Sequence, residues 1–126
     1  MNSLNKAQII GNLTRDTELK STANGQSVCT FGVATNRYWT DSNGQKKDEA
    51  EYHNVVSWGK LAEICGEYLS KGQQVYIEGK LKTRKWEKNG VTRYTTEVVC
   101  HEMKMLGPKN DTGHRVPEQD DDDIPF

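Results

Sequence analysis

Stretches that mix apolar and polar residues or are rich in β-forming residues recur along the chain, and at residues 52–58 the two kinds alternate with the period of two that a β-strand produces. Gly11 interrupts the first of these stretches, and a glycine inside a strand is typical of a bulge or a sharp bend. The second stretch carries β-forming and small residues on both faces, as a buried barrel strand does. The pattern predicts five strands, at residues 5–13, 28–36, 52–58, 74–87 and 91–105.

The segments between these strands contain turn signals. Asn-Gly steps at 24–25 and 89–90 favour tight turns, and the second of them joins the last two strands as a hairpin. Residues 38–50 are polar and include Asp-Ser-Asn-Gly at 41–44. We therefore expect a loop there that is long enough to act as a functional flap.

One stretch has helical spacing instead. Between Leu61 and Leu69 the apolar residues form a single stripe of a short helix, and Gly72 suits its end. Three strands, one helix and two strands is the element order of a five-stranded OB-fold barrel, so we expect an all-β domain over residues 1–107. Residues 108–126 are rich in Gly, Pro, Asn, Asp and Gln without periodicity, and we expect them to form a disordered tail.

Charge is unevenly distributed, although the formal net charge is only −1. Residues 1–110 contain sixteen Lys and Arg against twelve Asp and Glu, a balance of +4, whereas residues 111–126 contain one Arg against six acids, a balance of −5. A mildly basic body with an acidic tail is typical of a polyanion-binding protein that carries an interaction tail. Because there is neither a membrane-length apolar run nor a signal-peptide core, we expect a cytoplasmic protein without membrane contact.

The cysteines and histidines are scattered along the chain. The three cysteines lie beside apolar residues in predicted strands or the helix, so we expect buried free thiols. Neither residue type shows the short spacing that closes a tetrahedral metal site, and we expect no metal and no other cofactor. These residues are Cys29, Cys65, Cys100, His53, His101 and His114.

Candidate binding residues gather on one face of each of two predicted strands, and Trp39 stands at the edge of the polar segment. Unpaired nucleic acid exposes base faces and a flexible phosphate chain, so its binding requires aromatic rings interleaved with cations. Such binding also weakens as salt rises. The first face carries Tyr52, Asn54, Val56 and Trp58, and the second carries Lys80, Lys82, Arg84 and Trp86.

Each of these features alone has a simpler explanation. A Trp in a strand usually packs in a core or an interface, and a row of Lys and Arg is more often a solvated face. Their coincidence favours binding of unpaired nucleic acid and leaves an RNA-binding OB protein of the cold-shock type as an equal alternative. A nuclease is a third hypothesis, but the nearby acids Asp48, Glu49 and Glu51 are more simply a solvated loop.

Several blocks of the sequence, in their order and spacing, resemble the bacterial single-stranded DNA-binding proteins. The resemblance implies a non-enzymatic OB-fold homotetramer that binds single-stranded DNA without sequence preference. It also implies a place in DNA replication, recombination and repair, in the cytoplasm on the nucleoid. The blocks are Ile-Gly-Asn-Leu at 10–13, Gly-Lys-Leu-Ala-Glu at 59–63, Val-Tyr-Ile-Glu-Gly at 75–79, Thr-Arg-Lys-Trp at 83–86 and the terminal Asp-Asp-Asp-Ile-Pro-Phe at 121–126.

The resemblance also implies roles for particular residues. Tyr52, Trp58 and Asn54 stand where part of the family has Trp, Phe and Arg, and stacking survives the two aromatic exchanges because any ring offers a π-face. The implied stacking residues are Trp39, Tyr52, Trp58 and Trp86. The implied phosphate contacts are Lys6, Lys60, Lys71, Lys82, Arg84 and Lys85, and the implied subunit contacts are His53 and Tyr76.

The end of the chain has its own chemistry. Four consecutive acids from Asp120 repel one another, which alone would indicate a solubility tail. An apolar terminal residue after them suits a basic pocket on a partner that captures the carboxylate and inserts the ring. In the family this tip recruits replication, recombination and repair proteins, although the linker before it is short here. The implied partner-binding tip comprises Asp121, Asp122, Asp123, Ile124, Pro125 and Phe126.

Overall fold

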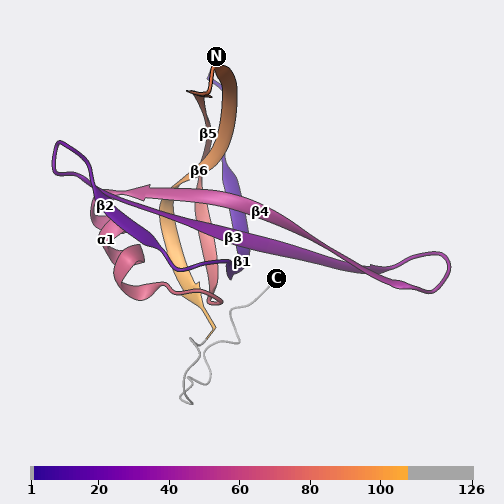
Figure 1. Cartoon of the computed structure of the whole chain (residues 1–126). Coiled ribbons are helices and arrows are strands. Elements are labelled where there is room, and N and C mark those ends of the chain that lie inside the picture. The colour runs from indigo at the N-terminus through magenta and orange to yellow at the C-terminus, as the bar shows by residue number, and fades with distance from the viewer. Residues whose placement is uncertain (1, 108–126) are drawn as a thin grey trace.

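The computed structural model describes residues 2–107, so the predicted tail and its acidic tip lie outside the described residues. The described part contains six strands and one helix, and the strands form one curved sheet (Figure 1). Within it, no helix is long and apolar enough to cross a membrane. The elements are β1 (Ala7–Leu13), β2 (Glu18–Ser21), β3 (Ser27–Thr40), β4 (Lys46–Trp58), α1 (Gly59–Tyr68), β5 (Gln74–Lys88) and β6 (Val91–Leu106).

Five of the strands close into a barrel in the order β1, β5, β6, β4 and β3, and β1 returns to pair with β3. Neighbouring strands are antiparallel except β4 and β6, which run parallel. The predicted all-β, five-stranded OB-fold barrel with one helix before its last two strands is therefore confirmed. The sixth strand, β2, pairs with β3 at the edge of the sheet, and the sequence did not predict it because all four of its residues are exposed.

The barrel is filled by alternate residues of its strands, because side chains in a strand point to opposite faces in turn. Phe31, Val33 and Ile77 are fully buried there, and the helix α1 adds Ala62 to the same cluster. All three cysteines are buried free thiols, as predicted. Burial raises the pKa of Cys65 to about 12, so this thiol stays protonated at neutral pH.

The predicted flap at 38–50 is wrong, because β3 and β4 continue through it as an antiparallel ladder. The pairing runs without a shift from Val28 opposite Trp58 to Thr40 opposite Lys46, so only residues 41–45 form the turn. The Asp41 carboxylate closes this turn by accepting backbone N–H groups two and four residues ahead, each at 2.9 Å. Both faces of this arm are largely exposed, which explains why hydrophobic alternation failed to predict it.

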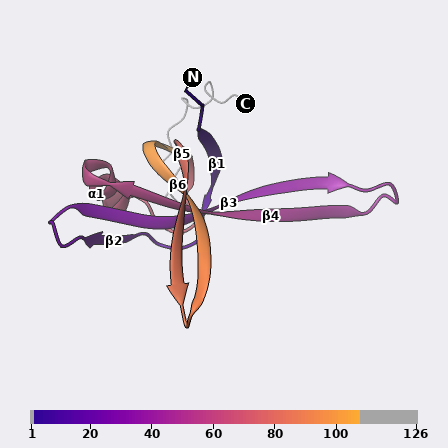
Figure 2. The ribbon, with the colours of Figure 1, turned by 90° about the horizontal axis from the view of Figure 1, so that it is seen from above.

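Two hairpins therefore leave the barrel, and Figure 2 shows that they point in different directions. The first is the arm formed by β3 and β4. The second is formed by β5 and β6, and it turns at Asn89 and Gly90, whose φ angles of 54° and 77° suit the tight hairpin turn that the Asn-Gly step predicted.

Gly79 marks a bulge at the base of the second hairpin. The register between β5 and β6 shifts there, so that Glu78 lies opposite Glu102 while Gly79 lies opposite Cys100. A Cβ on residue 79 would lie 2.0 Å from the carbonyl oxygen of Val99, which belongs to the backbone and has no room to move. The bulge therefore requires glycine, and its extra residue, His101 on β6, changes the side to which the following residues of β6 point.

Because of this close approach, Gly79→Ala should lower the free energy of unfolding by about 1–3 kcal/mol or more. Urea denaturation of the purified variants measures the change. The matched control is Gly66→Ala in α1, where a Cβ meets only the flexible Leu19 side chain at 3.0 Å and alanine favours the helix. A Gly79→Ala protein as stable as Gly66→Ala would contradict the close approach.

Candidate nucleic-acid interface

The site lies on the outer face of the barrel, where β3, β4, β6 and β5 lie side by side. One residue of each strand forms a row across this face, because the register places them opposite one another in turn. Their neighbours along each strand, such as Phe31 on β3, point into the core instead. The row consists of Thr30, Val56, Val99 and Lys80.

An open hollow of about 550 Å³ lies over this row. The Trp58 ring forms part of its wall and is 43% exposed. Three cations of β5 line the same hollow, and the two faces predicted from the sequence therefore adjoin. Besides the residues of the row, the lining comprises Trp58, Lys82, Arg84 and Glu97.

The hollow carries an excess of positive charge, with three cations against one carboxylate. Arg84 donates to Glu97 over 3.1 Å, and this hydrogen bond raises the pKa of the guanidinium. Glu97 thereby fixes the direction of Arg84. Lys80 and Lys82 form no ion pair within residues 2–107, so both ammonium groups are available to an anion.

Trp86 continues the same face of β5 toward the tip of the second hairpin. Its indole N–H donates to the Thr95 hydroxyl over 2.8 Å, and the ring is half-buried, so its orientation is held by the neighbouring strand. Lys85 lies on the opposite face of β5 together with Leu81 and Thr83. Side chains of a strand alternate between its faces, and Lys85 has an odd residue number, whereas the three cations of the hollow have even ones. The structure therefore does not bring Lys85 to the hollow.

The other two predicted stacking residues lie on opposite faces of the arm. Tyr52 shares the face of β4 that carries Trp58, and its side chain is 72% exposed. Trp39 lies on the face of β3 that carries the core residue Phe31 further down the strand. The Arg37 guanidinium lies 4.2 Å from the centre of the Trp39 ring, a cation–π contact. Trp39 is thus separate from the outer face of the barrel.

The remaining predicted phosphate contacts do not line the hollow. Lys60 lies in the first turn of α1, and Lys71 follows the helix with its backbone N–H bound to the Asp16 carboxylate over 2.9 Å. Lys6 precedes β1 and pairs with Glu78 over 3.5 Å. The three cations lie before β1, within α1 and after α1, and none of them lines the hollow with the cations of β5.

Two further cations, Arg15 and Lys20, lie on the outer face and were not predicted from the sequence. A Cβ built on Gly32 would lie 2.6 Å from a guanidinium nitrogen of Arg15, so this side chain covers the outer face of β3. Lys20 on β2 lies opposite Val28, which in turn lies opposite Trp58. Neither position belongs to a periodic pattern. The only signal in the sequence is the glycine at 32, which leaves room above a strand.

Glu78 is the centre of a polar cluster near the start of β5. It accepts a hydrogen bond from the Tyr76 hydroxyl, lies 3.1 Å from His101 and pairs with Lys6. These partners lower the pKa of Glu78 to about 2, and the hydrogen bond from Tyr76 has the largest effect. Its carboxylate is therefore ionised throughout the neutral range, and its charge is offset within the protein.

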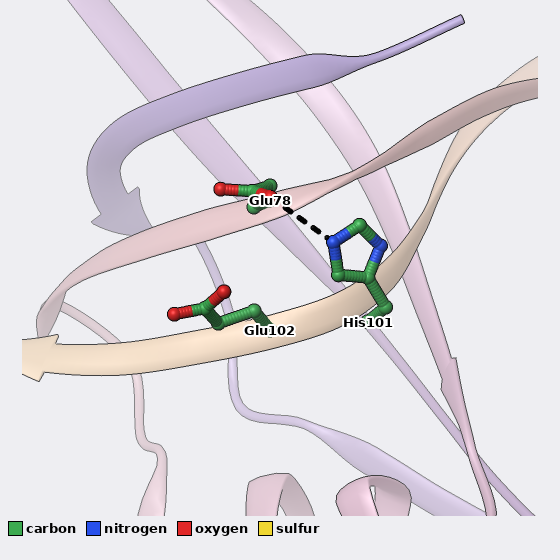
Figure 3. Close-up of side chains that lie close together, drawn as sticks. All are labelled: Glu78, His101 and Glu102. Carbon is green, nitrogen blue, oxygen red and sulfur yellow. Dashed lines mark hydrogen bonds and ion pairs between the residues drawn. The ribbon is translucent and has the colours of Figure 1, made fainter.

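The same cluster gathers potential metal ligands that the sequence spacing did not reveal. Figure 3 shows the His101 ring of β6 turned toward Glu78 of β5, with Glu102 next to His101 on β6. The ligand atoms of these three residues lie within 4.8 Å of one another. Glu78 already accepts from Tyr76 and His101, which accounts for the arrangement without a metal, and we assign none.

His53 and the acids of the arm complete the predicted residues. His53 is half-buried, with its ring nitrogen 3.0 Å from the Thr35 hydroxyl. Asp48 lies on one face of β4 and Glu49 on the other, where Glu49 pairs with Arg37 over 3.4 Å. The acids of the arm therefore do not converge as two-metal nuclease chemistry would require.

An OB barrel that combines exposed rings with cations on one outer face belongs to the class of OB folds that engage nucleic acid by stacking and phosphate contact. Residues 4–106 match the model of the single-strand binding protein family, and the chain belongs to this family. It is 51% identical to single-stranded DNA-binding protein 1 of Chlorobaculum tepidum over 87% of this chain and 69% of that one. It is 44% identical to single-stranded DNA-binding protein 1 of Xylella fastidiosa over the full length of both.

Solved structures show the same fold. A complex of the Plasmodium falciparum SSB with single-stranded DNA superposes with a TM-score of 0.77 at 31% identity, covering 85% of this chain and 98% of that one. The single-stranded DNA-binding protein of Thermus aquaticus, as a deletion mutant, gives a TM-score of 0.72 at 33% identity, covering 82% of this chain and 51% of that one.

Proposed function

We propose that the protein binds single-stranded DNA without sequence preference and protects it, as a binding protein and not an enzyme. The observation that carries this proposal is the hollow in which the Trp58 ring adjoins the cations of β5. Membership of the single-strand binding protein family and the names of its relatives support DNA as the ligand. A base stacks on the ring while its phosphate meets Lys80 or Lys82, and both interactions are independent of base identity.

Trp58→Ala should weaken binding to poly(dT) by about 1–3 kcal/mol, because one stacking ring is lost. Quenching of tryptophan emission at low salt measures binding by the wild type, and competition with a labelled oligonucleotide compares the variants. Tyr94→Ala is the matched control, since Tyr94 is 67% exposed but lies on the opposite face of the second hairpin from Arg84.

Equal affinity of Trp58→Ala and the control would show that the hollow is not the binding site. Poly(U) provides the comparison with RNA. A marked preference for poly(U) over poly(dT) would replace the proposed function by that of an RNA-binding OB protein.

We also propose that the protein assembles as a homotetramer in which His53 and Tyr76 lie at subunit contacts. Within the described residues, β1 pairs with β5 along Ala7–Asn12 but with β3 only at its last two residues. Residues 7–11 therefore leave one backbone edge unpaired, and an open edge of this kind is suited to pairing with another chain.

Light scattering on the full chain should give a mass near four times the 14.3 kDa of one chain. A change at the open edge should reduce this mass, because proline removes a backbone donor from a ladder. Gln8→Pro is the informative variant, with its fold checked by circular dichroism. A monomeric mass for the wild type would contradict the assembly.

The tail, residues 108–126, is proposed to link the barrel to a tip that recruits replication, recombination and repair proteins in the cytoplasm, on the nucleoid. The support is chemical: four acids followed by Ile-Pro-Phe suit a basic pocket with an apolar floor. Tail and barrel thereby have separate tasks, one for partners and one for DNA.

Deletion of Ile124–Phe126 should therefore abolish partner capture while leaving affinity for poly(dT) equal or higher. Pull-down from a bacterial extract with the full chain as bait measures capture. The control replaces the same three residues with Ser-Gly-Ser, which keeps the length of the tail. Undiminished capture by both variants would contradict the role of the tip.

A further inference from the structure

We propose that Tyr38 is an additional stacking platform and Arg15 an additional phosphate contact, so that the binding face continues from the hollow onto the arm. This inference rests on the proposed binding of single-stranded DNA. It concerns the path of the bound DNA beyond the hollow, because Trp58 and the cations of β5 would contact only the first part of that path.

Tyr38 lies on the same face of the arm as Tyr52 and Trp58. The β3–β4 ladder has no register shift, so faces can be followed along its whole length. Tyr52 lies opposite Ala34, and Tyr38 lies four residues further along β3, opposite Asp48. Even positions of both strands therefore share the outer face, which is the face that carries the hollow.

The Tyr38 ring has no structural task that would explain its position. Its side chain is 73% exposed, so it does not contribute to a core. Its cross-strand neighbour is the carboxylate of Asp48 and not a second ring, and its hydroxyl forms no hydrogen bond within residues 2–107. In contrast, Trp39 on the other face is covered by Arg37. A large exposed ring without a partner suits a ligand that supplies one.

The spacing of the rings suits a flexible strand. Six residues of β4 separate Trp58 from Tyr52, which corresponds to about 20 Å at the rise of a strand. Four more residues lead from Tyr52 to Asp48 beside Tyr38, a further distance of about 13 Å. Intervals of this size leave room for intervening nucleotides between the stacked bases, which a flexible single strand can span.

Arg15 supplies a cation in the first of these intervals. Its guanidinium lies over Gly32, which is opposite Asn54, and Asn54 lies between Tyr52 and Trp58 on the same face. Along this face of the arm, the Arg15 guanidinium therefore lies between the rings of Trp58 and Tyr52. Bases and phosphates alternate in the same way along single-stranded DNA. Near Tyr38 the same face of β4 carries one acid, Asp48, and one base, Lys46, so this part of the face has no net charge and Tyr38 contributes by stacking.

The test compares Tyr38→Ala, Tyr38→Phe and the control Tyr94→Ala on oligothymidylates of about 4 and about 16 nucleotides, the range that one OB fold covers. Tyr38→Ala should weaken binding of the longer oligonucleotide roughly tenfold, because one base loses its platform. Binding of the shorter one, which is held at the hollow, should remain unchanged. Tyr38→Phe should retain full affinity, because it retains the ring.

Arg15→Gln should lower the slope of log affinity against log salt by about 1, since one phosphate contact is lost. Lys47→Gln, on the face of the arm opposite to Tyr38, is its control and should leave the slope unaltered. Equal affinities of Tyr38→Ala and Tyr94→Ala for the longer oligonucleotide would overturn the proposed path. A change of the assembly mass in Tyr38→Ala would also overturn it, because the ring would then serve a contact between copies.

Failure of this inference is distinguishable from failure of the proposed function. If the wild type binds neither oligonucleotide, the function itself is wrong. If the wild type binds both and Trp58→Ala weakens both, but Tyr38→Ala weakens neither, only the path along the arm is wrong.

Discussion

The parallel pairing of β4 with β6 joins the first hairpin to the second, while β1 joins them on the other side of the barrel. It is short, consisting of Val55 with Val98 and Val56 with Val99. Without it the Trp58 ring and the cations of β5 would belong to separate surfaces. Because the paired residues alternate between core and outer face, the same contact closes the core and forms the floor of the hollow.

The site depends on the strand register, because a slip of one residue turns every side chain of a strand to the other face. At the Gly79 bulge β6 carries one extra residue, His101, while β5 keeps its alternation, so Lys80 and Lys82 stay on the face opposite Ile77 and Leu81. On β6 the extra residue exchanges the two faces: Met103 packs against the core on one side of the bulge, and Cys100 and Val98 do so on the other. Glu97 and Val99 therefore face the hollow. The bulge thus selects which residues of β6 form the site.

The barrel could be predicted from the sequence because its strands have one buried face, and burial leaves an alternating pattern. The arm and β2 could not, because both of their faces are exposed and alternation carries no information there. The faces of Trp58 and Lys82 followed from the period of two, but their adjacency depends on pairing between distant strands. Arg15 reaches the site from a connecting segment, where no periodicity indicates direction.

For Trp39, the sequence also left open the face of the sheet on which the ring lies. A resemblance transfers a role by position, whereas the ladder of the arm fixes the side on which a ring lies. Once β3 is known to extend to Thr40, the odd numbering that Trp39 shares with Phe31 places it on the other face from Tyr52. The two rings therefore cannot contact the same segment of a strand that follows one face.

That the arm is a ladder and not a loop also affects the thermodynamics of association. A flexible flap would have to be ordered on binding, at about 1–2 kcal/mol of backbone entropy for each residue immobilised. In the ladder, backbone hydrogen bonds have already fixed these residues during folding. A ligand that meets the arm therefore loses little affinity to conformational entropy of the protein, and the cost of ordering falls on the flexible strand alone.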